Sequence, residues 1–460
     1  MLKQSALKTL LQLDVPENAT SILIYVEQIS PRLNYVCEFI FKHVLKLNYT
    51  ITSIKAEFLA SSSVKLNYSH EIIPEVLQIL PQGLVYETGI SEKKPEPIFQ
   101  NDCLYFYPAP LNPQETSSLF HFDLFSSIFY LISRYEEWQS FKPDSHQRFE
   151  VEQSCLYQNS FHLKPLIEQW LIEFQEAFLN LYPTFVFPTK HFQVLSTIDV
   201  DNLYAYKSKG LLRTIGAGMK DILKGDFFNL KERIAVVFNK KKDPFDIYEE
   251  VSDFCFENKI PLIYFFLFRT GDHFNRTVNP KSKAFKNVFQ TLKANKAIIA
   301  VHPSYEAAYQ ERFLREELTQ LSQQVNEPIT NSRQHYLRFD IKSTPKHLLK
   351  NGIQCDFTMG YASQPGFRAG TSHPFYYYDF DAEKTSELLF VPFCMMDGAY
   401  TVYSSRNSKE ALDDMLKMAK DIKKVNGYYI SVFHERSFSN HLYPGFGTLY
   451  KKLHTMLKAL

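Results

Sequence analysis

The sequence predicts an α/β protein whose second half forms a parallel sheet and whose first half forms a smaller α/β unit. Short apolar, β-prone runs alternate with longer amphipathic segments from about residue 190 onward, which is the pattern of repeated β/α units. The length of 460 residues also exceeds one ordinary compact core and favours two domains. This pattern leaves both a parallel β/α barrel and a doubly wound sheet open.

The first half begins as a compact α/β unit and ends at a proline-containing linker. Strands are expected at residues 22–26, 49–52, 64–68 and 104–107, and helices at 33–44, 123–135 and 165–179. The linker is marked by Pro183, Pro188 and Lys190. We therefore predict an N-terminal domain of residues 1–189 and a second domain of residues 190–460.

The second half alternates strand and helix candidates. Strands are expected at residues 194–198, 262–268, 297–301, 335–339, 388–392 and 428–433. Helices are expected at residues 246–258, 282–294, 305–325, 344–351, 409–425 and 447–460. In a parallel sheet of this kind, functional side chains gather at the carboxyl ends of the strands.

Residues 207–242 interrupt this alternation. The segment is rich in Lys and Arg and carries apolar residues at helical spacing, among them Leu211, Leu212 and Ile215. We expect an inserted helical lid whose apolar face packs on the mouth of the barrel while its lysines are solvated. The alternative is an amphipathic segment that makes peripheral contact with a membrane surface.

Composition and charge exclude several classes of protein. Hydrophobic residues make up 45% and charged residues 22% of the chain, so the protein is globular rather than disordered. The net charge of +1 gives no footprint for nucleic acid. The six scattered cysteines predict neither a zinc–thiolate site nor a disulfide framework. Since the sequence has no signal-peptide pattern and no apolar run near the ~18 residues of a membrane span, we expect a cytoplasmic protein without a transmembrane segment.

Two carboxylates follow the strand expected at residues 194–198. Asp199 and Asp201 stand two residues apart, so a shared site requires the chain to turn at Val200. The two would then play different roles, one as a base and the other as a metal ligand. The alternative is an Asp-rich strand exit in which Asp201 and Asn202 cap a turn.

A histidine follows the strand expected at residues 297–301. His302 is well placed as a metal ligand, because neutral imidazole binds Zn²⁺, although a structural role for it stays open. We expect Ser304 to cap the next helix, which would place Glu306 in its first turn. Glu306 is then either a metal ligand or a residue that stabilises the helix dipole.

Polar side chains near the later strands complete the set of candidates. Arg333 stands close to His335, so that a guanidinium beside an imidazole could orient a catalytic carboxylate or add a ligand. Arg368, in a loop with several glycines, could reach a carboxylate. His434 follows the last strand and could act as a general acid opposite Asp199.

The order of these motifs resembles that of the polysaccharide deacetylase family, the metal-dependent esterases related to the nodulation-factor deacetylases. The motifs are Thr-Ile-Asp-Val-Asp, His-Pro-Ser, Arg-Gln-His-Tyr, Gly-Phe-Arg-Ala-Gly-Thr and apolar-x-His, and they span roughly residues 190–460. The first 189 residues, with the run Ser-Arg-Tyr-Glu-Glu at 133–137, resemble the uncharacterised domain that precedes such deacetylases in some bacterial proteins. That second resemblance implies no function.

The resemblance to the deacetylases implies a distorted β/α barrel and a divalent metal, Zn²⁺ above all, held by one aspartate and two histidines. Asp199 resembles the base that activates the attacking water, Asp201 the metal aspartate and His302 the first metal histidine. Arg333 resembles the arginine that orients the base, and His434 the acid that protonates the leaving amine.

The chain departs from the family pattern at two positions. Val200 separates two aspartates that are usually adjacent, and Glu306 stands four residues after His302, where the second metal histidine is expected. Either Glu306 supplies an oxygen ligand, or His335 turns inward to complete the site, or the metal site is weak or lost.

We therefore predict a metal-dependent N-deacetylase that acts on an acetylated amino sugar or a glycan containing one. The first alternative is a catalytically inactive carbohydrate-binding protein on the same barrel, which would lack the third ligand. The second is a glycoside hydrolase that uses Asp199 and Glu306 as a carboxylate pair.

Overall fold

A curled, open sheet of nine strands forms the centre of the second half of the chain in a computed structural model, which describes residues 7, 10–110, 118–271 and 273–460. The strand order is β12-β13-β11-β10-β9-β8-β7-β15-β14, and every neighbouring pair is parallel except β12 and β13. The predicted α/β class with a distorted parallel barrel is confirmed, and the sheet is a half-barrel.

The strands of this sheet are short, and most of their side chains are buried. Their bounds are β7 (Gln193–Val200), β8 (Leu262–Leu267), β9 (Ile298–His302), β10 (Asn331–Ser332), β11 (Cys355–Asp356), β12 (Phe375–Asp379), β13 (Lys384–Phe390), β14 (Met395–Met396) and β15 (Tyr428–His434). Burial on both faces explains why β8 is a continuous apolar and aromatic run and why β15, before His434, is interrupted by a single polar residue, Ser431.

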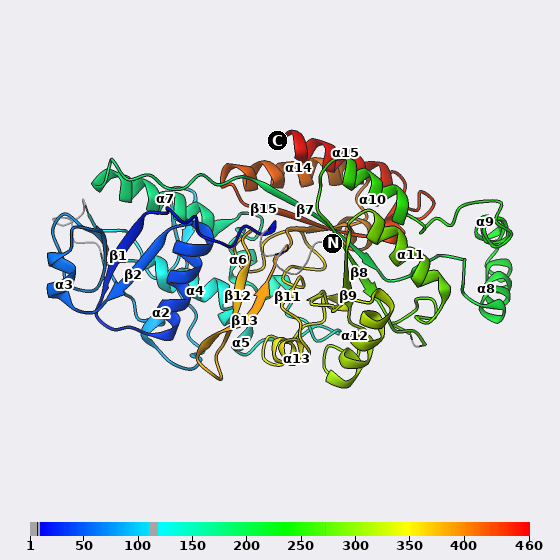
Figure 1. Cartoon of the computed structure of the whole chain (residues 1–460), viewed down its shortest axis with the longest axis horizontal. Helices are drawn as coiled ribbons and strands as arrows, with labels where there is room; N and C mark the ends of the chain where they lie inside the picture. Colours follow the sequence, from blue (N-terminus) through cyan, green and yellow to red (C-terminus); the bar gives the residue numbers. More distant parts are fainter. Residues whose placement is uncertain (1–6, 8–9, 111–117, 272) are drawn as a thin grey trace.

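Helices pack around this sheet (Figure 1). They are α10 (Tyr248–Glu257), α11 (Lys283–Ala294), α12 (Glu311–Val325), α13 (Thr344–Lys350), α14 (Ser408–Lys424) and α15 (Phe446–Ala459). A capping box starts α14, because the Asn407 side chain accepts from the backbone of Glu410 and the Glu410 side chain accepts from the backbone of Asn407. The helix then buries apolar residues at helical spacing, beginning with Ala411, Leu412 and Met415.

A smaller parallel sheet in the order β2-β1-β3-β4 organises the first half. Its strands are β1 (Ser21–Val26), β2 (Asn48–Thr52), β3 (Val64–Tyr68) and β4 (Leu77–Ile79), and β5 (Ile98–Gln100) and β6 (Cys103–Tyr105) form a separate hairpin. The helices are α2 (Pro31–Cys37), the π-helix η1 (Glu38–Val44), α3 (Lys55–Ala60), α4 (Leu124–Ile132), α5 (Tyr135–Trp138), α6 (Cys155–Gln158) and α7 (Leu166–Leu181).

Buried polar contacts and a shared core join the two halves. The carboxylate of Glu168 on α7 lies 2.7 Å from Nδ1 of His373, and Arg32 on α2 pairs with Glu383 at 2.7 Å. One hydrophobic cluster runs from Ile22 to Leu457. The domain boundary at residue 189 stays a prediction.

Two predicted elements near the site are wrong. The strand expected at residues 335–339 is a 3₁₀ turn, η4 (His335–Leu337), because Tyr336 and Leu337 have φ values of 59° and 52° that a strand cannot adopt. The helix expected from residue 305 begins at Glu311. Ser304 is therefore not its cap, and instead its hydroxyl donates to Glu317 at 2.5 Å.

Residues 207–242 form two helices, α8 (Leu211–Leu223) and α9 (Phe227–Val237), at one end of the molecule (Figure 1). The prediction that their apolar face packs on the barrel mouth is wrong, because most of those side chains are exposed to solvent. None of the helices in the described part of the chain has the length and apolar character that a membrane crossing requires.

Candidate active site

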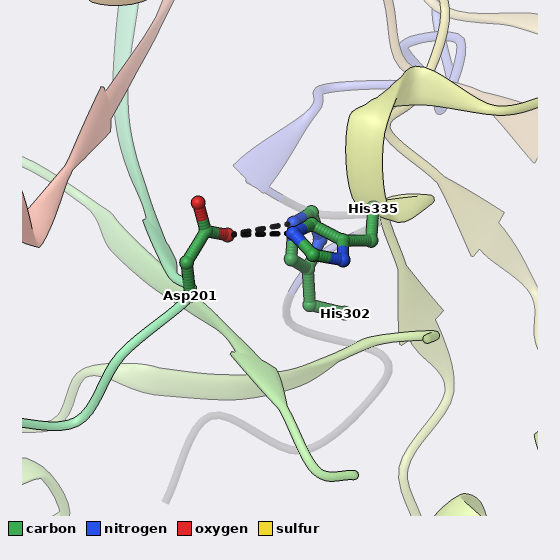
Figure 2. Close-up of side chains that lie close together, drawn as sticks. All are labelled: Asp201, His302 and His335. Carbon is green, nitrogen blue, oxygen red and sulfur yellow. Dashed lines mark ion pairs between the residues drawn. The ribbon is translucent and has the colours of Figure 1, made fainter. Parts of the chain in front are cut away.

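Three side chains that could hold a metal ion converge at the carboxyl ends of the central strands, and we refer to them as the metal-ligating group (Figure 2). Oδ1 of Asp201 lies 3.4 Å from Nε2 of His302 and 3.3 Å from Nε2 of His335. All three ligand atoms lie within 4.8 Å of one another. Two imidazole nitrogens and one carboxylate oxygen at this spacing leave room for a single ion between them, with a fourth position for water or substrate.

Asp201 reaches this position because the chain leaves β7 at Val200. The buried carboxyl group of Glu435 accepts hydrogen bonds from the backbone N–H groups of Asp201 and Asn202, each at 3.1 Å. Burial, followed by the neighbouring Asp201 carboxylate, raises the pKa of Glu435 to about 8. Through these two hydrogen bonds Glu435 holds the turn after the strand.

The orientation of the two histidines suits metal binding. Nδ1 of His302 lies 2.6 Å from the carbonyl oxygen of Arg333, and because a carbonyl only accepts, Nδ1 is the donor. The Nε2 lone pair of a neutral His302 then faces Asp201. Burial lowers the pKa of His335, outweighing the opposite effect of Asp201, so the neutral, ligating form of His335 is favoured.

The two oxygens of Asp201 have different partners. Arg436 donates to Oδ2, whereas Oδ1 is buried and has no hydrogen-bond partner among the residues that the structure describes. Burial alone would raise the pKa of Asp201, but Arg436 and His335 hold it well below its usual range. An ionised, buried oxygen without a hydrogen-bond donor, facing two imidazole nitrogens, fits a divalent cation such as Zn²⁺.

Asp199 lies beside this group and is fixed by Arg333. Nη1 of Arg333 donates to Oδ1 of Asp199 at 2.7 Å and also to the Thr197 hydroxyl at 2.8 Å. Nε of Arg333 donates to the carbonyl of Phe357 at 2.9 Å, and the guanidinium lies 4.4 Å from the ring centre of Phe265. The other carboxylate oxygen of Asp199 lies 4.0 Å from Nε2 of His302 and so faces the metal-ligating group.

His434 forms a buried pair with Asp397 on the other side of Asp199. Register places His434 on β15 directly opposite Asp199 on β7. Nδ1 of His434 lies 2.6 Å from Oδ1 of Asp397, while Oδ2 of Asp397 accepts from the His434 backbone at 2.7 Å and from the Ser437 hydroxyl. Burial and Arg436 act to lower the pKa of His434, but Asp397 outweighs them and raises it. A protonated imidazole is what a general acid requires.

These groups open onto one cavity of about 260 Å³. Asp199, Asp201, His302, His335 and His434 all line it. The wall also includes Arg148 from the first half of the chain and two aromatic side chains, Tyr336 and Tyr403. The cavity therefore places polar, titratable groups against apolar rings, as small-molecule sites do.

Two predicted site residues lie elsewhere. The Glu306 carboxylate accepts from Nδ2 of Asn275 at 2.8 Å and is not part of the metal-ligating group. Arg368 pairs with Glu137 at 2.6 Å and lines a neighbouring cavity instead. The structure thus brings His335 rather than Glu306 beside His302, while the metal and catalytic roles of the remaining candidates stay predictions.

Two residues of this site, Asp397 and Arg436, were not among the candidates predicted from the sequence. Asp397 follows the apolar strand β14, and this is the same pattern of a strand ending in an acid that drew attention to Asp199. Arg436 stands two residues after His434 in the predicted strand exit. Each could therefore be recognised in the sequence as a polar residue at a strand end. The sequence does not reveal that Asp397 pairs with His434 or that Arg436 pairs with Asp201.

Known proteins resemble parts of this chain in sequence or in fold. Residues 22–183 match the model of a family of unknown function, DUF7033, and no curated protein matches the chain. Similar solved structures are a protein of Mycobacterium smegmatis described as a polysaccharide deacetylase (13% identity, TM-score 0.40), Puue allantoinase (11%, 0.39) and a protein of Pseudomonas aeruginosa PAO1 described as a polysaccharide deacetylase (9%, 0.37). The similarity covers 60%, 59% and 59% of this chain and 87%, 85% and 86% of the three structures, respectively. A function for this chain must therefore be inferred from its own residues.

Proposed function

We propose that the chain is a zinc-dependent hydrolase that removes acetyl groups from the nitrogen of an amino sugar or of a glycan containing one. The observation that carries this proposal is the joint placement of three ligating atoms, of Asp201, His302 and His335, beside a carboxylate held by Arg333. The order of the sequence motifs, which resembles that of polysaccharide deacetylases, supports the same reaction and suggests the saccharide.

Each polar group has a defined task in this reaction. A Zn²⁺ ion bound by the three ligands would polarise the acetyl carbonyl and lower the pKa of water. Asp199 accepts a proton from the water while the water oxygen forms its bond to the carbonyl carbon. His434, protonated through its pairing with Asp397, donates a proton to the nitrogen as the carbon–nitrogen bond breaks. The products are acetate and the free amine.

Arg333 and Asp397 act through these two groups. Arg333 fixes the Asp199 carboxylate with one oxygen toward the ligating atoms, so that no reorientation is needed during proton transfer. Asp397 fixes the tautomer of His434 by accepting from Nδ1, which leaves Nε2 for the substrate.

The glycoside hydrolase alternative requires a second carboxylate near Asp199. Glu306 does not supply it, because its carboxylate bonds Asn275 and does not line the cavity. Among the described residues, the other carboxylate that lines the cavity is Asp201, which Arg436 pairs with and whose pKa is held well below its usual range, so it is not the protonated acid that a glycoside hydrolase needs.

Acetate release tests the proposal directly. The full chain is stripped of metal with a chelator, reloaded with Zn²⁺ and incubated with N-acetylglucosamine, its oligomers and other N-acetylated saccharides. We expect acetate and free amine in equal amounts from at least one substrate, and none from the chelated protein. Reducing ends without acetate, or no product while zinc is bound stoichiometrically, would contradict the proposal.

A further inference from the structure

The helical pair α8–α9 carries an apolar face that contacts solvent. Within α8, Leu212 is 86%, Leu223 85% and Leu211 75% exposed. The exposed apolar residues of α8 are Leu211, Leu212, Ile215, Met219, Ile222 and Leu223, and those of α9 and its C-terminal end are Phe227, Phe228, Ile234, Val237 and Phe238. Isolated exposed apolar residues are ordinary, but a contiguous set of this kind marks an interaction surface.

The exposed residues of α8 occupy one side of the helix. At 100° per residue, the positions from Leu211 to Leu223 fall within an arc of about 120°. On the same wheel Lys220 falls about 60° beyond one edge of this arc, and Arg213 and Lys224 about 80° and 100° beyond it, so that basic side chains lie on one side of the apolar face. The small residue Gly218 faces α9, where a side chain at this position would meet Leu230.

The pair is folded and fixed to the rest of the chain. Arg233 on α9 pairs with Asp221 on α8 at 2.8 Å and lies 4.9 Å from the ring centre of Tyr206. Asp243, just after the pair, accepts backbone hydrogen bonds from Ala205 at 2.9 Å and from Tyr206 at 2.8 Å. These contacts hold the helical pair in place, and it lies at one end of the molecule (Figure 1).

The segment that contains α8 and α9, residues 207–242, is positively charged. Residues 207–242 contain ten Lys and Arg but three Asp and Glu, a net charge of +7, whereas the whole chain carries +1. A second copy of this chain docked face to face would bring two such charges together, which opposes self-association through this face. An anionic lipid surface offers both an apolar interior for the exposed side chains and negative charge for their basic border.

We propose that α8 and α9 form a peripheral membrane-binding element that inserts its apolar face into an anionic lipid surface. The element begins ten residues after Asp201, and Lys209, which leads into it, donates to the side chain of Asn202, so that the membrane-binding element is joined to the strand exit of the candidate active site. An amphiphilic, lipid-linked acetylated saccharide is then the form of substrate best placed to reach the cavity. This last step rests on the proposed function, whereas the lipid contact does not.

Vesicle sedimentation with the full chain tests the lipid contact. We expect the protein to sediment with vesicles of mixed phosphatidylcholine and phosphatidylglycerol but not with phosphatidylcholine alone. Leu212→Gln/Leu223→Gln removes two of the most exposed apolar side chains, and we expect the affinity to fall by about tenfold or more. The matched control is Leu59→Gln/Val186→Gln, at exposed positions of the first half, which should bind as the wild type does.

A second pair of variants isolates the charge. Lys220→Gln/Lys224→Gln should weaken binding to the anionic vesicles by about tenfold or more, whereas Lys417→Gln/Lys420→Gln on α14 should not. Leu212→Gln/Leu223→Gln and Lys220→Gln/Lys224→Gln should both release acetate from a water-soluble substrate at the wild-type rate. This result would separate the proposed function from the lipid contact. Equal binding by wild type and Leu212→Gln/Leu223→Gln would overturn it. The proposal would also be overturned if the wild type bound no vesicles. A wild-type dimer in sedimentation velocity that Leu212→Gln/Leu223→Gln converts to monomer would overturn it as well.

Discussion

Nε2 of His335 lies 3.3 Å from Oδ1 of Asp201, and this contact completes a group of three metal-ligating atoms. His335 reaches Asp201 because the chain turns sharply after it, at Tyr336 and Leu337, both with positive φ. The position four residues after His302, which holds Glu306, is consequently not needed for a third ligand. Asp201, His302 and His335 therefore offer three ligand atoms without Glu306.

Asp199→Asn should remove the base and retain the metal site. An amide has nearly the same shape as the carboxylate but cannot accept a proton from water, so we expect kcat to fall by about 10³-fold or more. Elemental analysis should still find zinc, because Asp199 is not one of the three ligating residues. Asp201→Asn is the matched variant and should lose both zinc and acetate release. Retention of more than a tenth of wild-type kcat by Asp199→Asn would show that another group is the base.

Asp397→Asn should move the alkaline limb of the pH–rate profile to lower pH. His434 must be protonated to donate, and Asp397 raises its pKa against burial and Arg436, so activity is lost as the pH rises through that raised pKa. Removing the anion lowers the pKa of His434, and the limb of kcat/KM follows it. Ser437→Ala, which removes a hydrogen bond to Asp397 but no charge, should shift the limb less. An unchanged limb in Asp397→Asn would argue against His434 as the acid.

Glu317→Gln should reduce the dependence of stability on pH. Glu317 is buried beneath Ser304, and burial raises its pKa from 4.5 to about 7. The folded state therefore holds the Glu317 proton more tightly than the unfolded state does. The contribution of this proton to the free energy of unfolding is complete below about pH 4.5 and is lost as the pH rises through about 7. The loss is on the order of 3 kcal/mol. Urea unfolding at pH 5 and pH 8 should show a smaller difference for the variant than for the wild type, and equal differences would count against a buried, protonated Glu317.

Arg368→Met should destabilise the fold. The guanidinium of Arg368 is paired with Glu137 from the first half of the chain, and both side chains are buried. Glu137 keeps a second buried partner, Arg134 at 2.8 Å, so the free energy of unfolding should fall by less than the roughly 3–5 kcal/mol expected for a buried charge with no partner at all. Arg368→Met/Glu137→Gln, which removes both charges, should recover part of that loss in urea unfolding. If Arg368→Met unfolds at the wild-type urea concentration, the pair does not stabilise the contact between the halves.

Much of the fold and part of the site could be predicted from local sequence. The strand ending at Val200 was recognisable because a β-prone run stops at two acids, and parallel strands bring such ends to one edge. The same reasoning placed His302, Arg333 and His434 together. These predictions need only the spacing of apolar residues along the chain and the rule that parallel strands end at one edge of the sheet. Both can be applied to a sequence without knowing its long-range contacts.

Other features depend on long-range geometry that no local pattern records. Whether Glu306 or His335 would face Asp201 was decided by the positive φ values after His335, and Tyr and Leu do not signal such a turn. Arg368 was identified as a basic residue near glycines, but its partner Glu137 lies in the other half of the chain. The apolar spacing of residues 211–223 predicted an amphipathic helix correctly, yet periodicity alone could not tell what the apolar face contacts.

Zinc binding by two single variants shows whether His335 or Glu306 belongs to the metal site. The full chain, His335→Ala and Glu306→Ala are stripped of metal, and zinc affinity is then measured by competition with a chromophoric chelator. If Asp201, His302 and His335 hold the ion, His335→Ala should bind zinc at least about 100-fold more weakly, and Glu306→Ala should bind it as the wild type does. Wild-type affinity in His335→Ala, or its loss in Glu306→Ala alone, would contradict the account.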